Sequence, residues 1–247
     1  MHRHLRIDGW YGRLGNNIQQ IGNALMICEL VGYQGVIIPA HSFFNFSYIP
    51  LHASLFELNS SIGVRPSNFF HWKEGPEKTV LIPYNYIKEN MVRVLQQYLL
   101  PLIKKDDLYI QNFDGLTIHI RGGDVFSKPR GSSMDSLYIQ NPLIYYKDLI
   151  REHKLCRIIT EPRWETNPVL SALLHDHPHL IIQSSTVWND FITLMNSEII
   201  ATSGVGTFAA AAALLNKNLK KLYYSDLYLC EHLNPEFLNS KFCSVKT

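Results

Sequence analysis

Short apolar runs alternate with helix-periodic segments along most of the chain. The apolar run at residues 5–8 predicts a strand, and the run at 35–39 predicts another that ends at a proline. Between them, apolar side chains recur every three or four positions, as on one face of a helix, at Leu14, Ile18, Ile21, Leu25 and Cys28. This order predicts a compact βαβ unit at the start of the chain.

The middle of the chain has a weaker pattern. Residues 40–78 are rich in aromatic residues, Asn, Ser and Pro without a sustained period, which predicts irregular structure with one short helix. A strand is expected at 79–82 and a helix at 87–103, followed by a polar break at Asp106 and Asp107. We therefore expect a boundary between two halves near residue 110.

Strands and helices alternate more clearly in the second half. Strands are expected at 116–120, 157–160, 180–182, 198–201 and 219–224. Helices are expected at 142–152, 168–174, 187–195 and 207–215. The alternation predicts an α/β fold with mostly parallel sheets, divided into halves at 1–110 and 111–247.

Composition narrows the class of protein. With 247 residues, of which 46% are hydrophobic and 18% charged, the chain is long enough and apolar enough to bury a core. Its net charge of +2 argues against binding nucleic acid through bulk charge. The sequence has no apolar run long enough for a membrane helix and no stretch typical of a signal peptide, so we expect a cytoplasmic protein.

Three glycine-containing turns follow predicted strands. The first, Gly12–Asn17 with the sequence GRLGNN, lies between a strand and a helix. Its glycines let a ligand approach the backbone, and the N–H groups of the following helix favour an anion. An ordinary glycine turn explains the same residues equally well.

The second motif, HIRGGD from His119 to Asp124, begins at the C-terminal end of the predicted strand 116–120 and continues into the turn after it. In open parallel sheets, ligands bind at this end of the strands. Arg121 is suited to hold a diphosphate bidentately, and the adjacent glycines permit close packing against it. The alternative is an ion pair between Arg121 and Asp124 that fixes the loop.

The third turn, Ser203–Phe208 with the sequence SGVGTF, precedes an Ala-rich helix. Small residues before a helix N-terminus are typical of phosphate-binding loops. The spacing of Gly204, Gly206, Ala209 and Asp226 also matches a dinucleotide fingerprint, which makes an NAD(P)-binding protein an alternative. The stretch after Asp226 is too short for a second nucleotide-binding half, which counts against that alternative.

Several common sites have no counterpart in the sequence. It contains no Gly-x-Ser-x-Gly elbow, no P-loop and no Cys-x-x-Cys pair. The histidine cluster from His175 to His179 includes a proline and precedes a predicted strand, which favours a solvated turn over a metal site. No Asp-x-Asp pair is present to hold a divalent ion, so we expect neither a metal nor another cofactor.

Taken together, GRLGNN, HIRGGD and SGVGTF resemble motifs of the fucosyltransferase superfamily. That superfamily carries GR-x-GNQ, H-x-RR-GD and a late Ser/Thr-Phe motif, and the chain looks most similar to glycosyltransferase family 11, the α-1,2-fucosyltransferase-like branch. Residues 138–146 resemble the segment after the Arg motif, and Asn189–Phe191 resembles an Asp-Phe helix of such enzymes. The matching positions span residues 9–224, and their order and spacing carry the resemblance.

The resemblance implies a GT-B-like fold of two Rossmann-like halves, the first of them reduced. It implies an inverting, metal-independent hexosyltransferase that moves fucose from GDP-fucose to a hydroxyl of a glycan acceptor. Arg121 would be the main diphosphate ligand, and Asp124 is the nearest candidate for the catalytic base. The residues expected to bind the donor are Gly12, Arg13, Gly15, Asn16, His119, Ser203, Gly206, Thr207 and Phe208.

Two positions depart from the family pattern. Gly122 stands where the family has a second Arg, and Asn17 stands where it has Gln. The loss of one cation leaves the donor open to another GDP-deoxyhexose such as GDP-rhamnose. A non-catalytic protein of the same fold that binds carbohydrate or a protein partner is a further alternative.

Overall fold

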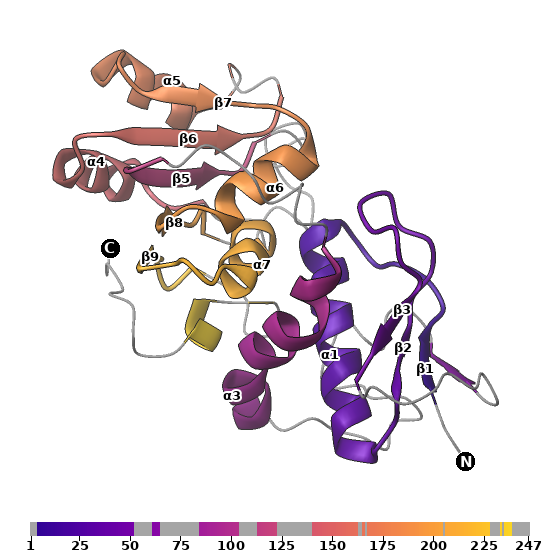
Figure 1. The fold of residues 1–247 in the computed structure, drawn as a ribbon. Helices are drawn as coiled ribbons and strands as arrows, with labels where there is room; N and C mark the ends of the chain where they lie inside the picture. Colours follow the sequence, from indigo (N-terminus) through magenta and orange to yellow (C-terminus); the bar gives the residue numbers. More distant parts are fainter. Residues whose placement is uncertain are drawn as a thin grey trace, which may run out of the picture. The chain divides into compact units, whose positions relative to one another are not determined.

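The computed structural model describes residues 4–51, 61–64, 84–103, 113–122, 140–162, 165, 167–204, 206–227, 233 and 235–238. The chain divides into two compact units, each with its own sheet (Figure 1). The first unit comprises Met1–Leu108 and Cys230–Asn239, and the second comprises Tyr109–Leu229 and Ser240–Thr247. The chain therefore returns to the first unit at Cys230–Asn239. The expected division into 1–110 and 111–247 assigned this segment to the second half.

The first unit contains a mixed sheet of four strands within the described residues. The strands are β1 (His4–Ile7), β2 (Gly35–Ile37), β3 (Tyr48–Pro50) and β4 (Ser61–Val64), in the order β3-β2-β1-β4. β1 runs parallel to β2 and β4, whereas β2 and β3 are antiparallel. The expectation of irregular structure over 40–78 is wrong at β3 and β4, because strands this short show no readable alternation. The strand expected at 79–82 lies outside the described residues.

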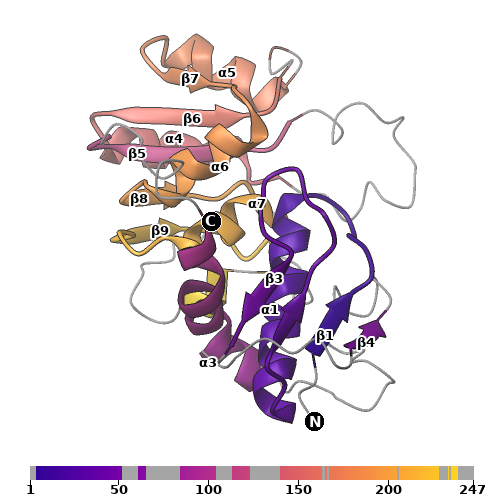
Figure 2. The same ribbon diagram turned by 45° about the vertical axis from the view of Figure 1, so that its right-hand side comes forward.

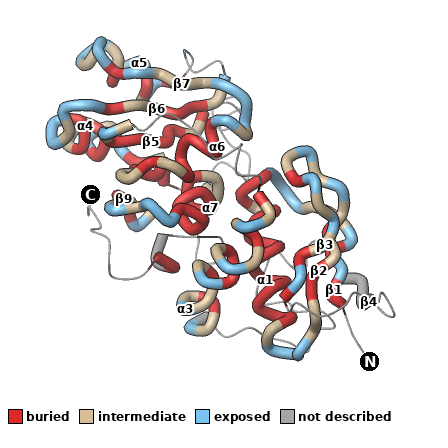
Figure 3. The backbone as a smooth tube through the Cα atoms, in the orientation of Figure 1, coloured by how far each residue is buried: buried red, intermediate tan, exposed pale blue. Residues whose placement is uncertain are grey.

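Helix α1 (Leu14–Val31) packs against this sheet and is buried along most of its length (Figure 3). The apolar spacing predicted the helix but not the burial of its polar residues. Four of these are buried as well: Asn17, Gln19, Gln20 and Asn23. One of them ties the C-terminal segment to this unit, because the Oε1 atom of Gln19 accepts a hydrogen bond from the backbone N–H of Leu233 at 2.9 Å.

The helix expected at 87–103 consists of three successive segments. Helix α3 (Tyr84–Val94) continues into a π-helical turn, η2 (Leu95–Leu99), and then into a 3₁₀ turn, η3 (Leu100–Leu102). Pro101 lies in this last turn, and a proline there ends the α-helical hydrogen bonding because it has no N–H to donate. A further 3₁₀ turn, η8 (Pro235–Leu238), contacts α3.

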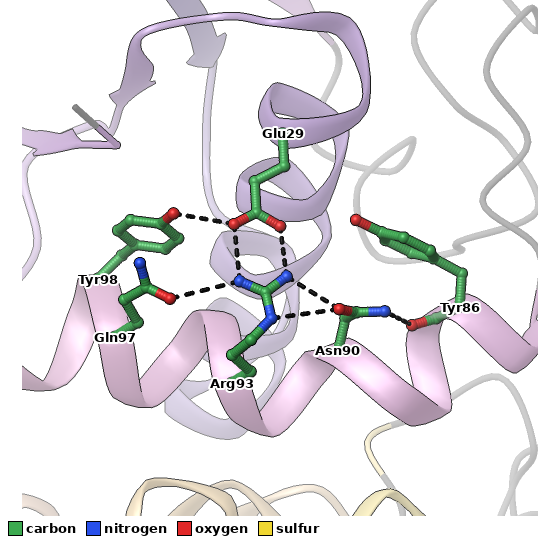
Figure 4. Close-up of polar contacts among 6 residues, drawn as sticks. All are labelled: Glu29, Tyr86, Asn90, Arg93, Gln97 and Tyr98. Atoms are coloured by element: carbon green, nitrogen blue, oxygen red, sulfur yellow. Dashed lines mark hydrogen bonds and ion pairs between the residues drawn. The ribbon is translucent and has the colours of Figure 1, made fainter.

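A polar network joins α1 to α3 and η2 (Figure 4). Arg93 donates to both carboxylate oxygens of Glu29, at 2.8 and 2.5 Å, and the Tyr98 hydroxyl donates to the same carboxylate at 2.9 Å. The side-chain oxygens of Asn90 and Gln97 accept further hydrogen bonds from Arg93. The hydrogen bonds from Arg93 lower the pKa of Glu29 below its ordinary value, and the same pair raises the pKa of Arg93.

Replacing Glu29 with Gln should destabilise the protein at neutral pH and have little effect in acid. The folded-state pKa of Glu29 lies below the unfolded one, so its carboxylate stabilises the fold above the unfolded value and loses that effect as the pH falls through the folded pKa. We expect the free energy of unfolding to fall by about 1–2 kcal/mol at neutral pH, since solvent screens the partly exposed Arg93. Urea denaturation at neutral pH and at about pH 3 measures the difference.

Glu198→Gln is the matched control for this network. It breaks the exposed ion pair between Lys220 and Glu198, which are 2.7 Å apart, and should change the stability by less than about 0.5 kcal/mol. Equal losses in Glu29→Gln and Glu198→Gln would show that the Arg93 network contributes no more than a surface ion pair.

The second unit contains a parallel sheet of five strands within the described residues (Figures 1 and 2). The strands are β5 (Leu116–Ile120), β6 (Cys156–Thr160), β7 (Ile181–Gln183), β8 (Ile199–Ala201) and β9 (Lys221–Tyr223). Their order is β7-β6-β5-β8-β9, from top to bottom in Figure 1, and every neighbouring pair is parallel. The prediction of an α/β fold with a mostly parallel sheet is confirmed.

Helices connect these strands and cover the sheet. They are α4 (Leu143–Glu152), α5 (Pro168–Asp176), α6 (Val187–Met195) and α7 (Phe208–Leu215). Helix α4 contacts α5, and α6 contacts α7. This pairing is expected when right-handed crossovers place α4 and α5 on one face of the sheet and α6 and α7 on the other. Strand β5 is buried at every position (Figure 3), and its apolar side chains pack with those of β6, α4 and α5. No helix in the described part of the chain is long and apolar enough to cross a membrane.

Candidate functional site

The strand order of the second sheet reverses between β5 and β8. From β5 the chain moves outward through β6 to β7, then returns to the other side of β5 as β8 and continues to β9. In open parallel sheets, ligands bind outside the carboxyl ends of the two strands at such a reversal. The HIRGGD motif begins within β5, and the SGVGTF motif begins after β8. Two motifs identified separately in the sequence therefore start at the two strands on either side of this reversal.

Arg121 follows β5 directly, and its guanidinium lies beside the turn that follows β8. A Cβ atom added to Gly206 would be 3.7 Å from the Nη1 atom of Arg121. Gly206 has a φ of 157°, a conformation that residues with a side chain rarely adopt. Glycine at this position therefore brings the backbone close to the cation with no side chain between them.

His119 links the same two turns from inside the sheet. It is buried in β5, and its Nδ1 atom lies 3.1 Å from the Oγ atom of Ser203. The ring of His119 packs against Phe208, the first residue of α7, with 5.3 Å between the ring centroids. Phe208 in turn contacts Phe191 of α6 edge to face, at 5.4 Å. These contacts join β5, the turn after β8 and α6.

The structure thus brings together most of the donor-binding residues expected in the second half. They are His119, Arg121, Ser203, Gly206 and Phe208, and Thr207 immediately precedes α7. Asp124 lies outside the described residues, which end at Gly122 in this part of the chain.

Packing does not require the glycine at position 122. A Cβ atom there would lie 3.5 Å from the Oγ1 atom of Thr160 and 4.0 Å from the Nδ2 atom of Asn167, which are ordinary contacts. Lack of space for a Cβ atom therefore does not explain the glycine at this position.

Buried amide side chains around these turns were not identified from the sequence. The Nδ2 atom of Asn141 donates to the carbonyl of Thr202, after β8, at 2.9 Å. The Oδ1 atom of Asn141 accepts a hydrogen bond from the hydroxyl of Ser225, after β9. Asn141 therefore joins the carboxyl ends of two strands. The available sequence signal was an Asn-Pro pair before a predicted helix, which also occurs at Asn167.

The remaining predicted donor-binding residues lie in the first unit, in the turn between β1 and α1. They are Gly12, Arg13, Gly15 and Asn16. Gly12 has a φ of 71°, and a Cβ atom there would clash with the side-chain amide of Asn16, so this position requires glycine. Arg13 is exposed and occupies the N-cap position of α1, and Gly15 is buried in the first turn.

Asn17, where the family pattern has Gln, supports this turn. Its Nδ2 atom donates to the carbonyl of Tyr11 at 3.1 Å, and the Oε1 atom of Gln20 accepts from the N–H of Tyr11 at 2.9 Å. His41 places Nε2 3.2 Å from the Oδ1 atom of Asn17, while its Nδ1 accepts from the N–H of Phe43. Because Nδ1 is an acceptor, Nε2 carries the proton, and burial lowers the pKa of His41 in favour of this neutral form.

The histidine cluster from His175 to His179 lies at the end of α5 and beyond it. Asp176 pairs with Lys147 at 2.6 Å, and hydrogen bonds from Lys147 and His175 lower the pKa of Asp176 to about 2. In the part of the chain that the structure describes, no group of three or more His, Cys, Asp or Glu side chains is arranged to hold a metal ion.

Comparison with known proteins adds no family assignment. The chain matches no protein-family model, and no curated protein shows significant similarity to it. The resemblance to fucosyltransferases therefore rests on the sequence motifs, and the candidate site rests on the geometry of the second sheet.

Proposed function

We propose that the chain is an inverting, metal-independent glycosyltransferase that moves fucose from GDP-fucose to a hydroxyl of a glycan. The observation that carries the proposal is the guanidinium of Arg121 beside Gly206, where the strand order of the parallel sheet reverses. An arginine suits a diphosphate there, because its planar guanidinium donates two parallel hydrogen bonds to phosphate oxygens. The GT-B arrangement of two Rossmann-like halves belongs to the same proposal.

The proposed reaction is a direct displacement at the anomeric carbon of the donor sugar. The acceptor oxygen forms a bond to this carbon as the bond to the β-phosphate oxygen of GDP breaks, which inverts the configuration. Negative charge develops on the departing GDP, and Arg121 stabilises it as a preorganised donor. The proton of the acceptor hydroxyl passes to a carboxylate, for which Asp124 is the candidate. The alternative role for Asp124 is to orient Arg121.

The residues of the proposed site leave the sugar of the GDP donor open to one alternative. With Gly122 in place of a second Arg, the proposed diphosphate site has one Arg in the HIRGGD turn. Another GDP-deoxyhexose, such as GDP-rhamnose, is therefore the alternative donor. Measurable hydrolysis of either GDP-sugar by the purified chain would exclude a non-catalytic carbohydrate-binding protein.

GDP should bind at least about tenfold more tightly than UDP, a difference of about 1.4 kcal/mol. The proposal assigns a guanine nucleotide, so the base must contribute to the affinity. Isothermal titration calorimetry in excess EDTA measures both constants and tests metal independence in the same cell. Equal constants would leave only a general diphosphate site, and GDP binding that requires added manganese would contradict the metal-independent mechanism.

A dinucleotide-binding protein is the second candidate function. Strand β8, helix α7 and strand β9 form a βαβ unit that carries Gly204 and Gly206 in its first turn, and Asp226 follows β9. This is the arrangement of a dinucleotide fingerprint. Tighter binding of NAD than of GDP in the same titration would favour this candidate over the glycosyltransferase.

A further inference from the structure

Two side-chain amides converge on the carbonyl oxygen of Arg121. The Nδ2 atom of Asn167 donates to it at 3.1 Å, and the Nε2 atom of Gln140 donates to the same oxygen. Gln140 also forms a backbone bridge with Gly204, in the turn after β8. This carbonyl lies just beyond the last residue pair of β5 and β6. It therefore accepts hydrogen bonds from side chains rather than from the backbone of a neighbouring strand.

Asn167 is fixed from both ends of its amide. The residue is 1% exposed, and its Oδ1 atom caps α5 by accepting from the N–H groups of Val169 and Leu170, at 3.0 and 3.3 Å. Its Nδ2 atom is then directed at the carbonyl of Arg121. A buried amide held in this way has one orientation, so it couples the N-terminus of α5 to the main chain of Arg121.

We propose that Asn167 is a positioning residue that holds the main chain of Arg121 so that the guanidinium stays beside Gly206. The inference rests on the proposed function, because it assigns the residue that orients the proposed diphosphate ligand. A displacement of about 1 Å at a reacting group can lower a rate by about 10². Gln140 supports the same oxygen, so loss of Asn167 alone weakens the positioning without abolishing it.

Asn167→Ser separates the two roles of this side chain. Serine caps a helix about as well as asparagine, but it is too short to reach the carbonyl of Arg121. We expect kcat for transfer from the GDP-sugar to fall about tenfold, with KM changed by less than about twofold, because Arg121 acts on charge that develops in the transition state.

Asn216→Ser is the matched control. Asn216 is also a buried asparagine that donates to two carbonyls, those of Leu194 and Ser197, at 3.3 and 2.7 Å. Ser197 precedes β8, so these bonds lie at the amino ends of the strands, whereas Arg121 lies at the carboxyl ends. Asn216→Ser should lower the melting temperature about as much as Asn167→Ser does while leaving kcat unchanged.

A double-mutant cycle with Arg121→Ala tests whether Asn167 acts through Arg121. If it does, Asn167→Ser lowers kcat in the wild-type background and has no further effect once Arg121 is Ala. Equal losses in both backgrounds, or equal kcat for Asn167→Ser and Asn216→Ser, would overturn the positioning role and leave the proposed function intact. Absence of GDP binding by the wild-type chain would instead overturn the proposed function, and this inference with it.

Discussion

Arg121→Ala should lower kcat for sugar transfer by a factor of about 10² to 10³, or about 2.7–4 kcal/mol, as the loss of one preorganised oxyanion donor does. Arg121 directly follows the buried strand β5, lies beside Gly206 and is the only Arg or Lys in HIRGGD. With Gly122 in the second position and no metal in the proposed mechanism, Arg121 should stabilise much of the charge on the leaving group. Steady-state kinetics with the GDP-sugar measures the loss.

Arg121→Lys separates charge from geometry in the same assay. Lysine keeps the positive charge but not the planar fork of donors, so it should recover only part of the lost rate. The melting temperature of both variants should stay near that of the wild type. A folded Arg121→Ala protein with near-normal transfer would refute the site. A fall in melting temperature in both single mutants, one at Arg121 and one at Asp124, would indicate instead a structural ion pair between them.

The candidate site of the second unit could largely be predicted because its signals are local. Strand 116–120 is a β-branched, fully buried run, and glycines beside an arginine at the end of such a strand are visible in the sequence. The positions of β3 and β4 could not be predicted in the same way. They have three and four residues, and they form by pairing with β2 and β1 rather than through a pattern of their own.

The side chains that hold the site together depend on contacts distant in sequence. Asn141 donates to a carbonyl 61 residues away, and Asn167 to one 46 residues away. Each Asn-Pro pair predicts a helix start, but the carbonyl that its amide reaches is set by the order of the strands. A local pattern does not contain that order, so the helix starts were predictable and the hydrogen bonds to Thr202 and Arg121 were not.

Phe191→Ala should lower the free energy of unfolding by about 3–5 kcal/mol. Phe191 is fully buried in α6 and packs between Trp188, at 6.0 Å, and Phe208, at 5.4 Å between ring centroids. Truncation leaves a cavity that the neighbouring rings fill only in part. For a chain of this length, each kcal/mol shifts the melting temperature by about 2–4 °C, so calorimetry should show a fall of about 6–20 °C.

The same substitution should also weaken GDP binding, because Phe208 packs between Phe191 and His119. Once the ring of Phe191 is absent, Phe208 has space to move away from His119, whose Nδ1 atom is paired with Ser203 in the turn after β8. Phe191→Leu fills most of the volume and should keep the affinity for GDP at a cost of about 1 kcal/mol in stability. Titration far below the melting temperature separates the two effects. If Phe191→Ala then binds GDP as tightly as Phe191→Leu does, the aromatic contacts stabilise the fold without shaping the site.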